Sequence, residues 1–358
     1  MNKKPSMIFC INSKNIEKNF NQVSKFGNVF YPLKTNSNAE IIKILKPLTN
    51  PNGGFLLSNL SHFYALKKQK ISPKKMAFIN VCAEQKTLKK LYQNGVRFFA
   101  FDNIESLENF SKYADKKTTK ICVRISVCDV FDCDFSHLGA NLEQATKMLE
   151  FLKNSGFLYG ISFYLHKKLK FLNNSVQIML DFVLNNFKKF DIKFINIGGI
   201  FDNTNGLLEK IKNIKQQLGV EEINVEPGTK LLENSVDLYS QILAKKRQDF
   251  GYSLVLKNGI YSGFFDSVLY GKKYDMFLCC GGELIKLCTH KNKGFLCVKI
   301  FGATADSDDF VGDYYIDNKF AEQLEIADYI LVINCGAYFE ELFVDYCQDN
   351  QKKYIITK

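Results

Sequence analysis

The chain has 358 residues, of which 46% are apolar and 24% charged, and its formal net charge is +11. This length accommodates one barrel of about 250 residues together with a smaller domain. No apolar run approaches the roughly 20 residues that span a bilayer, and the opening "MNKKPSMIFCINSKN" has too short an apolar segment for a signal peptide. We therefore expect a cytoplasmic protein with no membrane partner.

The positive charge does not by itself indicate nucleic-acid binding. Lysines are spread along the whole chain, in segments such as "KNIEKN", "LKKQK", "FLKNSG" and "LAKKRQ", without a clustered basic face. Solvated helix faces explain them, so no nucleic-acid partner is expected.

The eleven cysteines are scattered and mostly lie inside apolar runs. This pattern is typical of reduced, buried thiols and not of a secreted disulfide framework. The densest group comprises Cys279, Cys280, Cys288, His290 and Cys297. Because it lacks the paired C-x2-C spacing of structural zinc sites, no metal is expected.

Short β-branched or aromatic runs recur along the first two thirds of the chain, after an N-terminal run "SMIFCIN" at 6–12. Eight such runs are "NVFYPLK" (28–34), "GFLLS" (54–58), "KMAFIN" (75–80), "RFFAFD" (97–102), "KICVRIS" (120–126), "GISFYLH" (160–166), "KFINIGG" (193–199) and "EINVEPG" (222–228). Each is apolar enough to form a strand buried on both faces.

Segments with the helical spacing of apolar residues separate these runs. Leu88 and Leu91 belong to one such segment, and Gly95 and Gly156 are stop signals after two of them. Alternation of strand and helix eight times predicts an α/β fold, a parallel (β/α)8 TIM barrel.

The pattern changes after Gly228. The apolar runs "YSLVLKNG" (252–259), "GFLCVKIFG" (294–302) and "ADYILVINCGAY" (327–338) are separated by turn signals and predict an antiparallel β-domain. We expect a barrel over 25–229 and a β-domain built from 1–24 and 230–358, with the N-terminal run as one of its strands.

Catalytic groups of such barrels lie at the carboxyl ends of the strands. The residues at those ends are Lys34, Arg124, His166, Gly198, Gly199 and Glu226. A desolvated lysine there has a lowered pKa and can form a Schiff base with a carbonyl group. From position alone, a lysine there more often extends to the rim or pairs with an acid.

The segment "FYPLKTNSN" resembles the lysine motif of the fold-type III pyridoxal-phosphate enzymes, particularly the ornithine, arginine and diaminopimelate decarboxylases. Similar segments follow in the same order: "NGVRFFAFDNIESLE", "VRIS", "INIGG", "VEPG", "VLYG", "GATADSDD" and "NCGAYF". The resemblance covers nearly the whole chain. It implies this same barrel with a β-domain, and a head-to-tail homodimer with shared active sites.

The resemblance also implies roles for particular residues. Lys34 is expected to form the Schiff base with pyridoxal 5'-phosphate and later to transfer protons, and Glu226 to face the pyridine nitrogen. The remaining roles are these: Gly198, Gly199 and Tyr338 at the phosphate, Arg124 near the lysine, Tyr164 stacked on the ring, and Asp306 and Tyr270 at the substrate. The implied reaction is decarboxylation of an ornithine-, lysine- or diaminopimelate-like amino acid, a step in amino-acid metabolism or polyamine biosynthesis.

Several positions depart from the family's pattern. Tyr164 replaces the histidine that stacks on the ring, while Ile200 and Thr229 replace a phosphate-loop glycine and an arginine. Lys167 could supply a compensating charge. Leu56 and His62 replace acidic residues, and Gly271 resembles the diaminopimelate enzymes.

The most consequential departure is Ala305, which stands where the family has a cysteine that helps protonate the intermediate after CO2 loss. Ala305 therefore leaves open an enzyme of the same scaffold with another substrate, or with decarboxylation coupled to transamination. The changed phosphate-binding positions Ile200 and Thr229 leave open a non-catalytic relative that binds a partner protein.

Overall fold

The computed structural model describes residues 5–49, 51–133, 136–166, 169, 174–199, 205–344, 346–347 and 352–357. They form two compact units, residues 17–231 and residues 1–16 with 232–358. The first unit is a barrel and the second a β-sheet domain. Each is described by itself below.

The barrel closes through eight parallel strands in chain order, from β2 round to β9. They are β2 (Asn28–Pro32), β3 (Gly54–Leu57), β4 (Met76–Phe78), β5 (Phe98–Phe101), β6 (Lys120–Arg124), β7 (Leu158–Leu165), β8 (Phe194–Gly199) and β9 (Glu222–Glu226). The predicted (β/α)8 barrel is confirmed. Every predicted range contains its strand except the sixth, because β7 begins two residues earlier than predicted, at Leu158.

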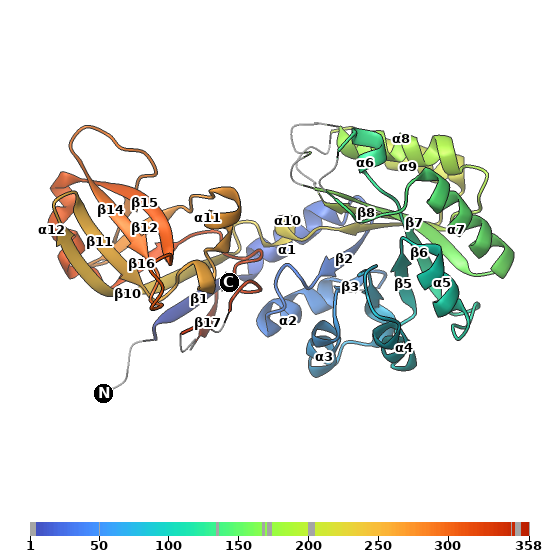
Figure 1. The fold of residues 1–358 in the computed structure, drawn as a ribbon, viewed down its shortest axis with the longest axis horizontal. Coiled ribbons are helices and arrows are strands. Elements are labelled where there is room, and N and C mark those ends of the chain that lie inside the picture. The colour runs from blue at the N-terminus through green and yellow to red at the C-terminus, as the bar shows by residue number, and fades with distance from the viewer. Residues whose placement is uncertain are drawn as a thin grey trace. The chain divides into compact units, whose positions relative to one another are not determined.

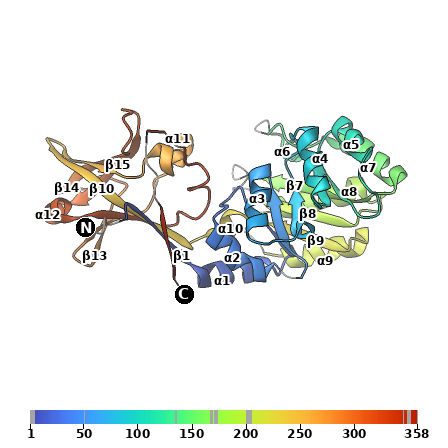
Figure 2. The same cartoon turned by 90° about the horizontal axis from the view of Figure 1, so that it is seen from below.

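Helices alternate with these strands and lie around them (Figures 1 and 2). They are α1 (Ser13–Val23), α2 (Ala39–Leu48), α3 (Leu60–Lys68), the 3-10 turn η1 (Pro73–Lys75), α4 (Gln85–Gln93), α5 (Ile104–Ser111), α6 (Cys128–Phe131), α7 (Leu142–Ser155), α8 (Ser175–Phe187), α9 (Leu207–Leu218) and α10 (Thr229–Leu232).

Asparagine side chains define where several of these helices begin. Asn38, Asn59 and Asn103 each accept a hydrogen bond from a backbone N–H of the first turn of α2, α3 and α5. Asn141 forms a reciprocal capping box with Gln144 at the start of α7, which ends at Gly156 in the left-handed conformation. These caps satisfy backbone donors that the helix itself leaves unpaired.

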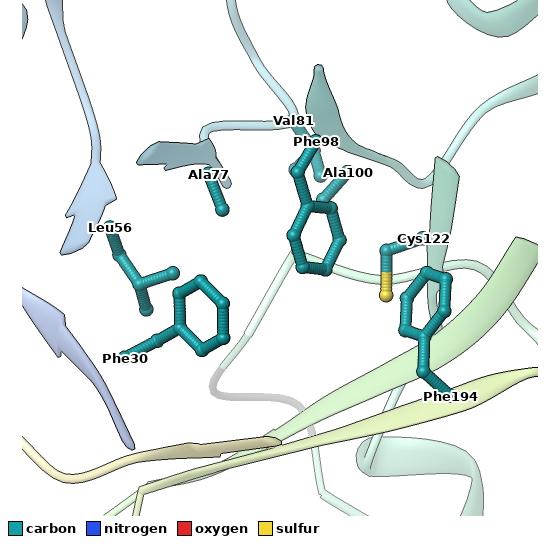
Figure 3. Close-up of a cluster of buried hydrophobic side chains, with 8 residues drawn as sticks. All are labelled: Phe30, Leu56, Ala77, Val81, Phe98, Ala100, Cys122 and Phe194. Atoms are coloured by element: carbon teal, nitrogen blue, oxygen red, sulfur yellow. The ribbon is translucent and has the colours of Figure 1, made fainter. Parts of the chain in front are cut away.

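Aromatic rings fill the middle of the barrel (Figure 3). The ring of Phe98 meets the ring of Phe30 edge-on at 5.9 Å and that of Phe194 at 5.1 Å between centroids. Leu56 and Cys122 belong to the same buried cluster. Edge-to-face pairs of this kind stabilise beyond the area that they bury, so the interior is a packed core and the site must lie at an end.

The second unit contains a nine-stranded, mostly antiparallel sheet among the described residues. Its elements are β1 (Met7–Asn12), β10 (Val236–Gln248), β11 (Gly251–Leu256), η3 (Ile260–Ser262), α11 (Phe265–Tyr270), β12 (Met276–Cys280), β13 (Glu283–Leu287), β14 (Phe295–Phe301), β15 (Phe310–Asp317), η4 (Asn318–Phe320), α12 (Ala321–Ile326), β16 (Tyr329–Val332) and β17 (Lys353–Thr357). The N-terminal strand β1 lies between β10 and β17. Two neighbouring pairs, β11 with β14 and β1 with β17, run parallel.

Asp309 is the buried carboxylate that ties two loops of this unit together. It is 1% exposed and accepts hydrogen bonds from the backbone N–H of Ile260 at 2.8 Å and from the hydroxyl of Thr304 at 2.7 Å. A Cβ at Gly259 or Gly302 would lie 2.0 or 2.1 Å from its carboxylate oxygens. Both positions therefore require glycine.

Among the residues that the structure describes, no helix is long and apolar enough to cross a membrane. The same residues contain no cluster of three or more histidine, cysteine or acidic side chains able to hold a metal ion.

Replacing Asp309 by alanine is expected to lower the free energy of unfolding by about 2–4 kcal/mol, because the N–H of Ile260 and the N–H and hydroxyl of Thr304 would lose their acceptor. The adjacent, exposed Asp308 provides a matched control: Asp308→Ala should change stability by no more than about 0.5 kcal/mol. Urea unfolding followed by circular dichroism measures both. Equal losses in the two variants would contradict the bridging role of Asp309.

Candidate active site

The carboxyl ends of the eight barrel strands meet at one end of the barrel. Arg124, Gly199 and Glu226 are the last residues of β6, β8 and β9. Tyr164 and Gly198 stand directly opposite each other on β7 and β8. The structure thus brings the predicted residues of the barrel to one end.

The sequence predicts that Lys34 ends the first strand. In the structure β2 ends at Pro32, and Lys34 lies in the turn that follows it. Leu33 still pairs with β3 through its N–H, which donates to Leu56 O at 3.1 Å, and the N–H of Thr35 then folds back to Pro32 O at 3.0 Å. Because Pro32 has a fixed φ and no N–H, the turn starts there. It leaves Lys34 at the rim of the barrel interior.

The ammonium group of Lys34 is held in an aromatic and cationic environment. Its Nζ lies 4.9 Å from the centre of the Tyr164 ring, and the guanidinium carbon of Arg124 lies 5.9 Å from the same ring. Burial is the main cause that lowers the pKa of Lys34, and the charge of Arg124 lowers it further, while Glu226 acts in the opposite direction. A lowered pKa increases the neutral, nucleophilic fraction of the amine.

The carboxyl group of Glu226 faces both cations. Burial raises the pKa of Glu226, whereas Arg124, a hydrogen bond from Asn196 and the charge of Lys34 lower it. Burial likewise lowers the pKa of Arg124, which Glu226 and Asp102 counteract. Lys34 and Arg124 therefore both interact with the carboxylate of Glu226, and Arg124 also interacts with that of Asp102.

A row of asparagines supports this carboxylate and was not predicted from the sequence. Asn196 Nδ2 donates to Glu226 Oε1 at 3.0 Å, Asn224 Nδ2 donates to Asn196 Oδ1 at 2.9 Å, and Asn28 Nδ2 donates to Asn224 Oδ1 at 3.1 Å. Asn196 and Asn224 are at most 1% exposed. The available signal was the amide inside the apolar runs "INIGG" and "EINVEPG", since a buried amide needs partners.

Backbone atoms approach closely at the two glycines that end β8. Gly199 has φ of +100°, and a Cβ there would lie 1.9 Å from Leu165 O. At Gly198 a Cβ would lie 3.0 Å from the Tyr164 ring and 3.1 Å from Glu226 Oε2. Only residues without a side chain keep this space open beside the ring and the carboxylate.

The hydroxyl of Thr35 adds an unsatisfied polar atom to this end of the barrel. Its Oγ1 is buried and has no hydrogen-bond partner among the described residues, and a Cβ on Gly228 would come within 2.4 Å of it. Together with this unpaired hydroxyl, the amine of Lys34, the carboxylate of Glu226 and the glycines that end β8 fit a pyridoxal phosphate.

Two replacements of acidic residues have structural explanations. Leu56 is fully buried in the aromatic core of the barrel. His62 is 6% exposed, and its Nδ1 accepts a hydrogen bond from the N–H of Ser58 at the start of α3. Leu56 and His62 therefore have structural roles in the barrel core and at the start of α3. Ile200 and Lys167 lie outside the described residues.

Asp306, Tyr338 and Tyr270 belong to the second unit. The hydroxyl of Tyr261 donates to Asp306 Oδ2 at 2.6 Å, and this hydrogen bond lowers the pKa of Asp306. Tyr338 has φ of +63°, a strained conformation for a residue other than glycine. Tyr270 ends α11 and is 52% exposed, and Ala305 is also exposed.

A cavity of about 1230 Å3 opens at the opposite end of the barrel. Its walls include Asn28, Phe98, Lys120 and Glu222, which are the first residues of β2, β5, β6 and β9. The packed core in Figure 3 lies inside the barrel between the two ends. This cavity is therefore not part of the site around Lys34.

Comparison with known proteins agrees with the geometry. Residues 13–231 match the family model described as the pyridoxal-binding domain of pyridoxal-dependent decarboxylases. Ornithine decarboxylase of Neurospora crassa is 21% identical over 354 residues, covering 86% of this chain and 71% of that protein.

Solved structures show the same fold over the whole chain. The arginine decarboxylase of Paramecium bursaria Chlorella virus superposes with a TM-score of 0.80 at 17% identity, covering 99% of this chain and 96% of the other. The lysine decarboxylase of Selenomonas ruminantium superposes with a TM-score of 0.77 at 19% identity, covering 99% and 93%. From the family match and the lysine site at the barrel end, we conclude that this chain belongs to the pyridoxal-dependent decarboxylases, enzymes whose cofactor is pyridoxal 5'-phosphate.

Proposed function

We propose that this protein decarboxylates a basic or diamino acid of the ornithine, lysine or diaminopimelate class and releases the corresponding amine and CO2. The observation that supports this most directly is the group of Lys34, Arg124 and Glu226 at one barrel end, with the amine pKa lowered and the carboxyl pKa raised. Bound pyridoxal phosphate supplies an electron sink for the electron pair that remains when CO2 leaves.

Lys34 and Glu226 would hold the cofactor at its two reactive positions. The neutral amine of Lys34 can attack the aldehyde carbon, and the same Nζ can later carry a proton. Asn196 occupies Glu226 Oε1, while Oε2 faces the space beside Gly198. Because its pKa is raised, this oxygen is a stronger base and can share a proton with the pyridine nitrogen.

The remaining groups would orient the cofactor. Tyr164 can stack on the ring, and the N–H groups of Gly198 and Gly199 with the hydroxyl of Tyr338 can bind the phosphate. Thr229 offers no charge in place of the family's arginine. We therefore expect weaker phosphate binding than in relatives that carry that arginine.

The substrate side of the proposal rests on Asp306 and Tyr270. The hydrogen bond from Tyr261 keeps Asp306 ionised, which suits a distal substrate ammonium. Helix α11 exposes Val268, Leu269 and Tyr270, whose exposed fractions are 58%, 51% and 52%. Such adjacent apolar side chains favour burial against a second copy of the chain, in a homodimer with shared active sites.

Ala305 supports a second candidate on the same scaffold. It carries no proton donor at the position where the family has a cysteine. If the proton were added to the cofactor's carbon and not to the carbon that lost CO2, decarboxylation would be coupled to transamination and would yield an aldehyde or ketone. Product identification distinguishes the two.

The full chain with pyridoxal phosphate is expected to turn yellow and to release CO2 from at least one of ornithine, lysine, arginine or diaminopimelate, with an amine as product. Lys34→Ala should lose the visible absorption band, because no amine remains to bind the aldehyde. Visible spectra and mass spectrometry of the products measure this.

Lys43→Ala, on the exposed face of α2, is the control and should keep both properties. An aldehyde or ketone with pyridoxamine phosphate would support the second candidate. A protein that stays colourless with added cofactor would refute both.

Removing the charge of Lys34 and removing the charge of Glu226 should change the free energy of unfolding of the cofactor-free protein in opposite directions. Lys34→Met removes one of two neighbouring cations and should raise the free energy of unfolding by about 1 kcal/mol. Glu226→Gln removes the carboxylate that both cations face and should lower the free energy of unfolding by about 3 kcal/mol. The exposed Lys147→Met serves as control, with an effect of about 0.5 kcal/mol or less. Urea unfolding measures all three, and a loss in Lys34→Met equal to that in Glu226→Gln would refute the charge argument.

Sedimentation is expected to show a dimer. Leu269→Asp should shift it towards monomer and reduce activity by at least about tenfold, because a charge would enter the buried face of the dimer. Ile326→Asp, on the separate helix α12 where Ile326 is 68% exposed, should remain dimeric and active. A fully active monomer would contradict the shared site.

A further inference from the structure

Two cysteines lie in contact in the segment that connects β6 to α7. The Sγ atoms of Cys128 and Cys133 are 2.8 Å apart, and both residues are half-buried thiols. Non-bonded heavy atoms normally touch at about 3.5–4 Å, and the covalent S–S bond is about 2.05 Å. The two sulfur atoms are therefore already closer than an ordinary contact.

The local backbone explains how the two thiols meet. Cys128 begins α6, a single turn whose first N–H donates to Ser126 Oγ at 3.2 Å. Asp132 then adopts the left-handed conformation with φ of +47°, and the N–H of Cys133 returns to Cys128 O at 3.4 Å. The chain closes on itself here, which brings the two side chains together.

No other cysteine shares this arrangement in the part of the chain that the structure describes. Cys122 and Cys335 are buried in apolar surroundings, which raise the pKa of both thiols. Cys279 and Cys280 are neighbours on β12, so their side chains point to opposite faces of the sheet. Cys82 is exposed.

We propose that Cys128 and Cys133 form a thiol–disulfide exchange site that takes low-molecular-weight disulfides. The thiolate of one cysteine attacks the external disulfide and forms a mixed disulfide, releasing one external thiol. The second cysteine displaces the other external thiol and closes the internal bond. Two protein thiols are oxidised, one external disulfide is reduced to two thiols, and the two protons leave with them.

The internal bond would hold the segment between Arg124 and α7. Asp129, inside the ring, accepts a hydrogen bond from the N–H of Leu142 at the start of α7 at 3.1 Å. Ile125 and Ala140 pair as a bridge at its base. The oxidised form should therefore keep α6 and the start of α7 in place and slow proteolysis within 125–133. This inference does not depend on the proposed function.

The test uses the full chain incubated with oxidised glutathione, followed by alkylation and peptide mass spectrometry. Cys128 and Cys133 should lose alkylation together and appear in one peptide that is two hydrogen atoms lighter, and dithiothreitol should restore both. Cys82, which is exposed, reports whether the oxidant acted, as a glutathione adduct. The internal bond should form at least about tenfold faster than any adduct on Cys279.

Two variants keep the result interpretable. Cys133→Ser should convert Cys128 to a glutathione adduct without an internal bond, and Cys279→Ser should behave like the wild-type chain. If Cys82 is modified while Cys128 and Cys133 remain alkylated, the proposal is refuted. Persistent glutathione adducts on both cysteines of the wild-type chain would also refute it, because the second thiol would then not displace the first adduct.

Discussion

The charges at the carboxyl end of the barrel constrain the rest of the site. Lys34 and Arg124 both lie near the ring of Tyr164 and the carboxylate of Glu226, and the charge of Asp102 also acts on Arg124. Burying charged groups costs free energy unless each group has partners. This requirement accounts for the aromatic ring beside the cations and the amides behind the carboxylate.

The barrel supplies rigidity for this unfavourable arrangement. The edge-to-face rings of Phe30, Phe98 and Phe194 fill the interior, so the strand ends have little freedom to move apart. The turn at Pro32 starts from the β2 strand that carries Phe30. Strand β2 therefore links the core to the position of Lys34. A smaller residue at Phe30 would leave a cavity in the core and would also make the position of Lys34 less fixed.

Much of the architecture was predictable because its signals are local. Eight apolar runs separated by amphipathic segments leave few alternatives to a closed parallel barrel, and the lysine after "FYPL" stands out as a cation in an apolar run. The asparagine row was not predictable in the same way, since its partners lie on different strands and their register appears only after closure. His62 and Leu56 stand where the family has acidic residues, and their burial places them at a helix start and in the core.

The second unit was predictable only in outline. Turn signals identify β11, β14 and β16, but nothing local specifies that β11 and β14 run parallel or that β1 lies between β10 and β17. The same holds for the hydrogen bond from Tyr261 to Asp306, which joins residues 45 positions apart. Pairings between distant segments depend on the whole domain and not on any short stretch.

The asparagine row also has a direction. Each amide donates through its nitrogen towards Glu226 and accepts through its oxygen from the next residue, ending at Asn28. Amide groups in such a row cannot relay protons, but their dipoles align and polarise one another. Turning one amide over would set two acceptors or two donors against each other, so the three can only reverse as a set. The acceptor oxygen of a single carboxyl group thereby sets the orientation of amide side chains on three strands.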